Sequence, residues 1–332
     1  MLSAPHTQLS GRVARVDRGA VDVLITAGDA FATVRATPST HELGPVVGDW
    51  VALSQLDADW RVDAVLPRRT VIERSAASGR SVAQVLAANI DVVFVAMPVT
   101  PEPKLALVER MIALAWDSGA TPVIVVTKSD LSEEVDAIVA DIADAAPGVD
   151  VVSVNVLSPD GLSSLSPYLL QGRTVCVLGR SGAGKSSLVN ALLGEEVLDT
   201  ADVRRDGKGR HTTTHRELHI LPGGAAIVDT PGLRGAGLFV SDEGLDLAFA
   251  DIEELVGSCR FNDCSHTQEP GCAVLQAVED GELPQRRLDS WRKLQREARW
   301  MAVRSDARLR AEVRRAWVIT HKEVRRSGRI RP

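Results

Sequence analysis

The chain contains a glycine-rich segment, GRSGAGKSS at residues 179–187, between a strand pattern and a helix pattern. Glycines let the backbone wrap a phosphate and point amides at it, and the amino terminus of the following helix adds positive potential. We therefore predict a nucleoside triphosphate site in which Lys185 reaches the β- and γ-phosphates and Ser186 ligates Mg²⁺. The predicted phosphate-binding residues are Gly179, Arg180, Ser181, Gly182, Ala183, Gly184, Lys185, Ser186 and Ser187.

A second phosphate-side motif follows the apolar strand pattern AAIVD and reads Asp229-Thr230-Pro231-Gly232. At the end of that strand, Asp229 is expected to hold Mg²⁺ through water, and the Gly232 amide to contact the γ-phosphate. Taken alone, these four residues also fit an ordinary turn at a strand end. Their position about 45 residues after the phosphate loop favours the nucleotide interpretation.

The segment Thr127-Lys128-Ser129-Asp130 follows the strand pattern TPVIVV and predicts a base-reading loop. Guanine presents N1–H and N2–H donors on one edge, so the Asp130 carboxylate can accept from both while the Lys128 stem packs on the ring. A buried carboxylate left unpaired by the wrong base can discriminate by about four orders of magnitude. The alternative is a plain surface turn, because TKSD is a short motif.

The order of these motifs is itself informative. GTPases ordinarily carry the base-reading motif after the phosphate loop, whereas here it comes about 50 residues before that loop. A second base loop is expected near Ser153 to Gly161. A circularly permuted G domain accounts for every strand pattern, so the predicted ligands are GTP or GDP with Mg²⁺.

Hydrophobic patterns divide the chain into three regions. Residues 11 to about 72 contain five short β runs broken by turn signals, which predicts a small β-barrel of the OB type. The Ser/Ala/Gly-rich stretch Ser75–Ser81 is the expected linker. From about residue 85, continuous Val/Ile runs alternate with helix patterns, as in a parallel sheet with helices on both faces. The last region is helical with one cysteine-rich insertion, and the expected domains are residues 1–74, 82–238 and 239–332.

Three of the four cysteines cluster with a histidine in the spacing C-x4-C-x-H-x5-C. Three thiolates and one imidazole within 14 residues suit a closed tetrahedral Zn²⁺ site with no open position for catalysis. A single structural zinc commonly contributes on the order of 10 kcal/mol to a segment with little core of its own. The alternative is a set of free thiols. The predicted ligands are Cys259, Cys264, His266 and Cys272, whereas Cys176 lies in a strand pattern and is expected to be a core residue.

Charge is distributed unevenly along the chain, whose net charge is −6. Residues 285–332 carry 16 Lys+Arg and 5 Asp+Glu, a local charge of +11, so the remainder carries −17. This asymmetry predicts an anionic partner for the C-terminal segment, nucleic acid first, with a solvated basic helix as the alternative. The apolar runs are too short to span a bilayer and the amino terminus lacks the apolar core of a secretory signal, so we expect a cytoplasmic protein without membrane contact.

Together these motifs resemble the RsgA/YjeQ family of small ribosomal subunit-dependent GTPases. The resemblance covers nearly the whole chain and rests on TKSD, GRSGAGKSS, GRHTTTH, DTPG and the cysteine–histidine cluster. It implies an OB-fold barrel that contacts rRNA, a permuted G domain and a zinc-binding helical domain. It also implies low intrinsic GTPase activity, stimulated by the 30S subunit with its 16S rRNA, and a role in late 30S maturation and factor release. We expect a monomer.

Catalysis needs a group other than the glutamine that follows the DxxG motif in Ras-like enzymes, because Leu233 occupies that position and cannot orient water. His211 lies in the polar segment Gly207–Thr214, suited to a first switch, and resembles the family histidine proposed to replace that glutamine. A solvated loop residue is the alternative for His211. Thr213 is expected to complete the Mg²⁺ shell when GTP is bound.

Two departures from the family pattern concern the base. Thr127 stands where many members have Asn, and we expect this to weaken a hydrogen bond that tethers a loop while leaving Asp130 intact. Asn155 lies near the position where Ser is usual, so no residue of the second base loop is assigned.

Three other functions fit parts of the sequence. A nucleotide-gated RNA-binding chaperone would use hydrolysis only for release, and the sequence separates it poorly from a dedicated enzyme. An ATP-dependent metabolic enzyme with a zinc ribbon conflicts with the guanine-reading Asp130. A zinc transcription factor leaves the phosphate loop unexplained.

Overall fold

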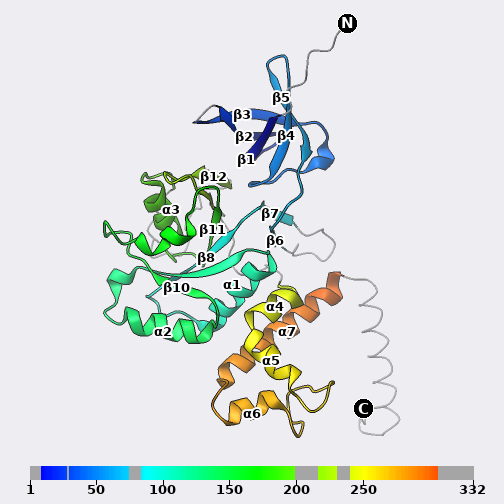
Figure 1. Ribbon diagram of the computed structural model, residues 1–332, viewed down its shortest axis with the longest axis vertical. Coiled ribbons are helices and arrows are strands. Elements are labelled where there is room, and N and C mark those ends of the chain that lie inside the picture. The colour runs from blue at the N-terminus through cyan, green and yellow to red at the C-terminus, as the bar shows by residue number, and fades with distance from the viewer. Residues whose placement is uncertain (1–8, 28–29, 75–83, 199–215, 230–239, 306–332) are drawn as a thin grey trace, which may run out of the picture. The chain divides into compact units, whose positions relative to one another are not determined.

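A computed structural model describes residues 9–27, 30–74, 84–198, 216–229 and 240–305 (Figure 1). Contacts divide the chain into two compact units. The first comprises residues 1–74 and 84–238, and the second comprises 75–83 and 239–332. Among the helices of the described residues, none combines the length and apolar character needed to cross a membrane. The predicted linker Ser75–Ser81 lies outside the described residues, and the three-domain division remains a prediction.

The amino-terminal strands close into a five-stranded barrel, as the five short β runs predict. They are β1 (Leu9–Asp17), β2 (Ala20–Ala27), β3 (Ala30–Pro38), β4 (Trp50–Leu56) and β5 (Asp59–Val65), with a 3₁₀ turn, η1, at His41–Leu43. Pairing runs β1-β2-β3-β5-β4 and returns from β4 to β1, which closes the ring. Val13, Val23, Leu53 and Val62 are fully buried in the barrel core.

The nucleotide-binding region is built on a mostly parallel sheet. Its strands are β8 (Val92–Pro98), β9 (Thr121–Thr127), β10 (Asp150–Ser153), β11 (Thr174–Leu178), β12 (Glu217–Ile220) and β13 (Ala226–Asp229). Their order is β10-β9-β8-β11-β13-β12, and only β12 is antiparallel to its neighbour within this set. The chain builds outward from β8 to β10 and then returns to the other side of β8 with β11. In open α/β sheets, such a reversal marks the crevice where ligands bind, at the carboxyl ends of the strands.

Helices cover both faces of this sheet. They are α1 (Leu105–Asp117), α2 (Val135–Ala145) and α3 (Lys185–Leu193), with 3₁₀ segments η2 (Ser129–Leu131) and η3 (Ser163–Tyr168). Phe94 on β8 shares an apolar core with Leu188 of α3 and Leu165 of η3. α1 contacts β8 and β9, and Figure 1 shows α1 and α2 on the other side of these strands from α3. The continuous Val/Ile runs are explained by this double coverage.

Three features differ from the sequence-based expectation. The run GLSSLSPYL, expected to continue the strand–helix alternation, folds as the short 3₁₀ segment η3, which contains Pro167, a residue with no amide to donate to a longer helix. The patterns also do not predict the hairpin of β6 (Val71–Arg74) and β7 (Gln84–Ala88) or the strand β12. β12 pairs with β13 on one side and with β1 of the barrel on the other. The barrel and the nucleotide-binding strands therefore form one continuous 11-stranded sheet.

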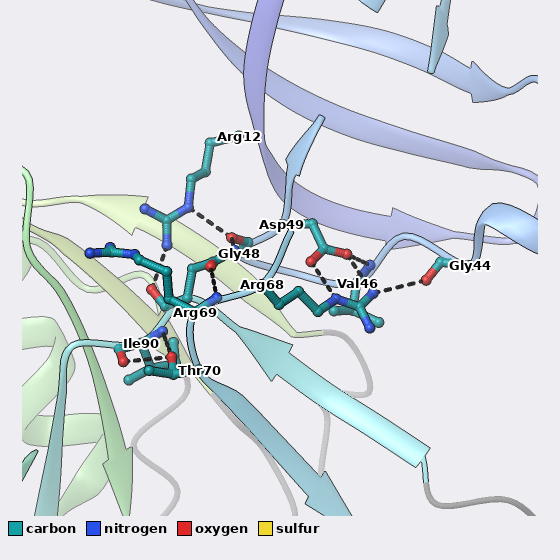
Figure 2. A network of polar contacts seen from close by, with 10 residues as sticks. Arg12, Gly44, Val46, Gly48, Asp49, Arg68, Arg69, Thr70 and Ile90 are labelled. Atoms are coloured by element: carbon teal, nitrogen blue, oxygen red, sulfur yellow. Dashed lines mark hydrogen bonds and ion pairs between the residues drawn. The ribbon is translucent and has the colours of Figure 1, made fainter. Parts of the chain in front are cut away.

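A buried arginine also joins the barrel to the segment before β8 (Figure 2). Arg12 donates from Nε to the Gly48 carbonyl at 2.9 Å and from Nη2 to the Asn89 carbonyl at 2.8 Å. The Asn89 side chain donates to the same Gly48 carbonyl at 3.0 Å. Burial lowers the pKa of Arg12 to about 10, so the guanidinium stays charged at neutral pH. Gly48 has φ +87°, and a Cβ there would lie 2.2 Å from the Ala88 carbonyl oxygen, so this close approach requires glycine.

An ion pair fixes the connection that leads out of the barrel (Figure 2). The Asp49 carboxylate is fully buried and accepts two hydrogen bonds from Arg68, at 2.7 and 2.8 Å. It also accepts from the Val46 amide at 2.8 Å. The hydrogen bonds that Arg68 donates to the Asp49 side chain raise the pKa of Arg68. Two parallel N–H···O bonds give this pair a defined geometry.

The second unit is helical. It contains α4 (Asp242–Ala248), α5 (Ala250–Gly257), α6 (Ala273–Glu279) and α7 (Gln285–Ser305). Arg287 of α7 is 1% exposed and donates to both oxygens of Asp251, at 2.7 and 2.6 Å, and to the Ala248 carbonyl. Trp291 and Leu294, three positions apart on α7, are also buried.

Candidate nucleotide site and metal centre

The phosphate loop connects β11 to α3. Gly184 caps α3 with φ 77°, and the helix begins at Lys185. Gly179 lies against the neighbouring strand β8, because a Cβ at Gly179 would stand 2.7 Å from the Ala96 carbonyl oxygen. The Lys185 ammonium donates to the Arg180 carbonyl at 2.8 Å, so it bridges the loop. Amides at the start of α3 and this ammonium together favour an anionic ligand.

Thr127 supplies a hydrogen bond between the base-reading strand and the phosphate loop. It is the last residue of β9, is buried, and its hydroxyl donates to the Ala183 carbonyl at 2.8 Å. A threonine hydroxyl therefore links the base-reading strand to the phosphate loop directly. The hydroxyl also passes close to Gly184, since a Cβ at Gly184 would lie 3.4 Å from Thr127 Oγ1.

The remaining base-reading residues lie between two loops. Lys128 adopts a left-handed φ of 58°, and its Cε lies 3.9 Å from where a Gly184 Cβ would stand, so its stem runs beside the phosphate loop. The Ser129 hydroxyl donates to the Val154 carbonyl at 3.0 Å, which attaches this motif to the loop after β10. Asp130 lies in η2 and is exposed, so its carboxylate is accessible to a ligand.

The loop after β10 is closed by its own hydrogen bonds. The Asn155 amide donates to the Gly161 carbonyl at 3.2 Å, and the Asn155 side chain accepts from the Leu157 amide at 2.9 Å. A Cβ at Gly161 would overlap the Asn155 carbonyl oxygen at 1.8 Å, so only glycine fits there. The Asn155 side chain thus stabilises its own loop, and we assign no base-contacting residue in this segment.

Asp229 is the last residue of β13 and lies at the same sheet edge as the phosphate loop. Its strand runs parallel to β11, with Val228 opposite Cys176. On the other side, Asp229 is opposite Glu217 of β12. Ser186, half-buried in the first turn of α3, belongs to the same edge. The three other predicted switch residues, His211, Thr213 and Gly232, lie outside the described residues.

Asn190 anchors the segment that follows α3, a role that the sequence did not predict. It lies on α3, is 7% exposed, and forms a double hydrogen bond with the backbone of Leu198, accepting at 2.8 Å and donating at 2.7 Å. This pairing fixes the chain that leaves α3 toward the predicted first switch. The available signal was an amide among the apolar residues of the helix, between Val189 and Leu192.

The four predicted zinc ligands converge. The ligand atoms of Cys259, Cys264, His266 and Cys272 all lie within 4.8 Å of one another. The sulfurs of Cys259 and Cys272 are 3.9 Å apart, and each is 3.5 Å from His266 Nδ1. A tetrahedron with Zn–S of about 2.3 Å and Zn–N of about 2.0 Å has edges of about 3.8 Å and 3.5 Å. These residues therefore fit Zn²⁺ in both chemistry and spacing.

Neighbouring polar groups hold the metal-binding loop in shape. The Glu269 carboxylate accepts from the Ser265 hydroxyl and from the amides of Ser265, Thr267 and Gln268. These bonds, that from the Ser265 hydroxyl first, hold the pKa of Glu269 well below its usual range. Arg292 of α7 donates to the His266 carbonyl. Such outer contacts orient metal ligands.

Comparison with known proteins agrees with this geometry. The RsgA GTPase family matches residues 65–239, which is more than half of the chain. The chain belongs to this family. It is accordingly a GTPase and binds guanine nucleotide. The small ribosomal subunit biogenesis GTPase RsgA of Streptomyces avermitilis is 51% identical over 317 residues, covering 93% of this chain and 85% of the relative. The small ribosomal subunit biogenesis GTPase RsgA 2 of Listeria monocytogenes is 40% identical over 331 residues, covering 98% of this chain and 94% of the relative.

Two solved structures are similar to this chain over most of its length. YjeQ from Thermotoga maritima superposes with a TM-score of 0.67 at 25% identity, covering 88% of this chain and 98% of that protein. YloQ, described as a circularly permuted GTPase, superposes with a TM-score of 0.66 at 28% identity, covering 90% of this chain and 97% of that protein. The barrel, the α/β GTPase region and the helical Cys3His region predicted from sequence are thus confirmed.

Proposed function

We propose that this GTPase acts in maturation of the small ribosomal subunit, where hydrolysis of GTP releases it and bound factors. The observation that carries the proposal is the permuted G fold, with the TKSD loop tied by Thr127 to the phosphate loop. Relatives that cover nearly the whole chain are named as small ribosomal subunit biogenesis GTPases.

The residues at the sheet edge divide into base and phosphate contacts. Asp130 accepts the two guanine donors and the Lys128 stem covers the ring. Lys185 and the amides of the phosphate loop bind the β- and γ-phosphates, with Ser186 and Asp229 on the Mg²⁺ side. Bound Mg²⁺ would offset phosphate charge in the transition state. Gly232, Thr213 and His211 keep their sequence-based roles at the γ-phosphate, the Mg²⁺ shell and the attacking water, respectively.

The metal centre stabilises the fold, and the basic segment binds RNA. Zn²⁺ held by the Cys3His cluster stabilises the loop between α5 and α6, with no coordination position left for catalysis. The barrel and the basic C-terminal segment contact 16S rRNA, whose phosphates attract the local charge of +11 in residues 285–332. The protein acts in the cytoplasm as a monomer.

GTP hydrolysis by the purified full chain, with and without ribosomal subunits, tests this function. We expect slow turnover alone, because Leu233 cannot orient water, and a large stimulation by 30S subunits. Purified 50S subunits serve as the control for nonspecific RNA effects and should not stimulate. Equal rates with 30S and 50S subunits would contradict the proposal.

A further inference from the structure

Strand β1 of the barrel carries two separate attachments to the nucleotide-binding sheet. Arg12 reaches the Asn89 carbonyl ahead of β8, and Arg15 donates to Glu217 of β12 at 2.8 Å. Unbroken alternation would direct side chains three residues apart to opposite faces of a strand. The β1–β2 register shifts between Val13 and Arg15, and such a bulge redirects the side chains that follow. Arg12 and Arg15 can therefore both contact the nucleotide-binding sheet from β1.

Arg15, Glu217 and Asp229 form one row across three adjacent strands. Arg15 is the cross-strand partner of Glu217, and Glu217 is the cross-strand partner of Asp229. Directly opposite residues share a face, with their Cβ atoms about 5 Å apart, and like charges in that position repel. Arg15 donates to the Glu217 carboxylate and so offsets part of the negative charge opposite Asp229. The barrel thus supplies one of the contacts that hold Glu217, the cross-strand neighbour of Asp229.

Arg15 is in turn fixed to the barrel itself. Its Nε donates to Asp17 at 3.1 Å, and Arg35 donates to Asp17 and Asp22 at 2.7 and 2.8 Å. The hydrogen bond with Asp17 raises the pKa of Arg15. A chain of charge pairs therefore runs from β3 through β1 to β12, and only the last of these pairs leaves the barrel.

We propose that Arg15 and Glu217 are positioning residues that couple the barrel to the strand ending in Asp229. The pair keeps β12 on β1, so a rearrangement at Asp229 on nucleotide binding reaches β1, and binding of a partner to the barrel reaches Asp229. This inference rests on the proposed role of Asp229 beside the bound nucleotide. It adds a route through β12, which contains none of the predicted nucleotide-contacting residues.

Hydrogen exchange of the full chain tests the coupling without ribosomes. The parent is compared with GDP and with a non-hydrolysable GTP analogue, both with Mg²⁺, and exchange is followed in the peptide covering β1, residues 9–17. We expect a difference between the two nucleotides in this peptide. In Arg15→Met and Glu217→Gln the difference should shrink about two- to fivefold, the effect of one partly exposed ion pair. Arg15→Lys keeps a charge that can pair with Glu217 and should preserve it.

Arg35→Met is the matched control. It removes one positive charge from the same network but leaves the contact to β12 in place, so the nucleotide-dependent difference should persist. Thermal midpoints of all variants show whether the barrel remains folded. An unchanged β1 peptide in the parent, or equal losses in Arg15→Met and Arg35→Met, would overturn the coupling. Absence of 30S stimulation would instead overturn the proposed function, because exchange is measured without subunits.

Discussion

Base recognition depends on a single carboxylate, and replacing Asp130 by Asn tests it. The amide cannot accept both guanine donors, but its N–H can donate to the second ring carbonyl of xanthine. We expect GTP affinity to fall by about two orders of magnitude or more, with xanthosine triphosphate bound in its place. Competition against a fluorescent guanine nucleotide measures both affinities.

Glu133→Gln is a suitable control for Asp130→Asn, because it removes the same charge from an exposed neighbouring position. It should leave guanine affinity unchanged. Retained GTP preference in Asp130→Asn would show that another group reads the base.

The hydroxyl of Thr127 is a second residue whose contribution can be isolated. Thr127→Val keeps the shape of the side chain but leaves the Ala183 carbonyl without its 2.8 Å hydrogen bond. We expect a loss of about 1–3 kcal/mol in the free energy of unfolding and faster nucleotide release. Urea denaturation and stopped-flow displacement of a labelled nucleotide provide the two measurements. Thr127→Ser restores the hydroxyl, and equal behaviour of the Val and Ser variants would rule out the tether.

Residues that contact the nucleotide could be predicted from the sequence, whereas a residue that contacts a distant part of the chain could not. The roles of Lys185 and Asp130 could be predicted because their ligand, a nucleotide, dictates the side chain and the motif around it. The junction residue Arg12 could not, since its partner Asn89 is 77 residues away and is contacted through its carbonyl group. Nothing in the local pattern distinguishes such an arginine from an exposed one.

The element most dependent on a metal is the loop between α5 and α6. Chelation of Zn²⁺ should unfold this loop, and Cys272→Ser should lower metal affinity strongly, because structural zinc contributes on the order of 10 kcal/mol at such sites. Metal content by mass spectrometry and far-ultraviolet circular dichroism report the two effects.

Cys176→Ala is the comparison for the zinc experiment. It removes a thiol that is buried in β11 and is not one of the four predicted ligands, and it should keep one zinc per chain. Full zinc content in Cys272→Ser would exclude Cys272 as a ligand.

Elements with strong periodicity were predicted closely, and elements held by distant neighbours were not. The strand pattern TPVIVV became β9, which extends it only by Thr127. β12 was not predicted because its four residues, ELHI, include the polar Glu217 and His219 and lack a strand pattern. They form a strand by pairing with β13 and β1. A strand that forms only by pairing with its neighbours need not show a strand pattern in its own residues.

For the whole molecule, the basic C-terminal segment is predicted to govern the salt dependence of ribosome binding. Residues 303–332 carry 10 Lys+Arg and 3 Asp+Glu. Each phosphate contact contributes about 0.7–0.9 to the slope of log affinity against log salt, so deleting this segment should flatten the slope. Affinity for 30S subunits is measured between low and physiological salt. Intrinsic GTPase activity checks that the shortened chain folds, and an unchanged slope would show that the segment does not contact RNA.

The pairing of β1 with β12 also has a consequence for biosynthesis. More than 200 residues separate Arg15 from its partner Glu217, so the barrel leaves the ribosome long before β12 is made. Amino-terminal domains generally fold first during translation. The barrel, whose hairpins need only nearby residues, can then present a finished strand on which β12 aligns. Translation order thus turns a contact of high sequence separation into the addition of one short strand to an existing template.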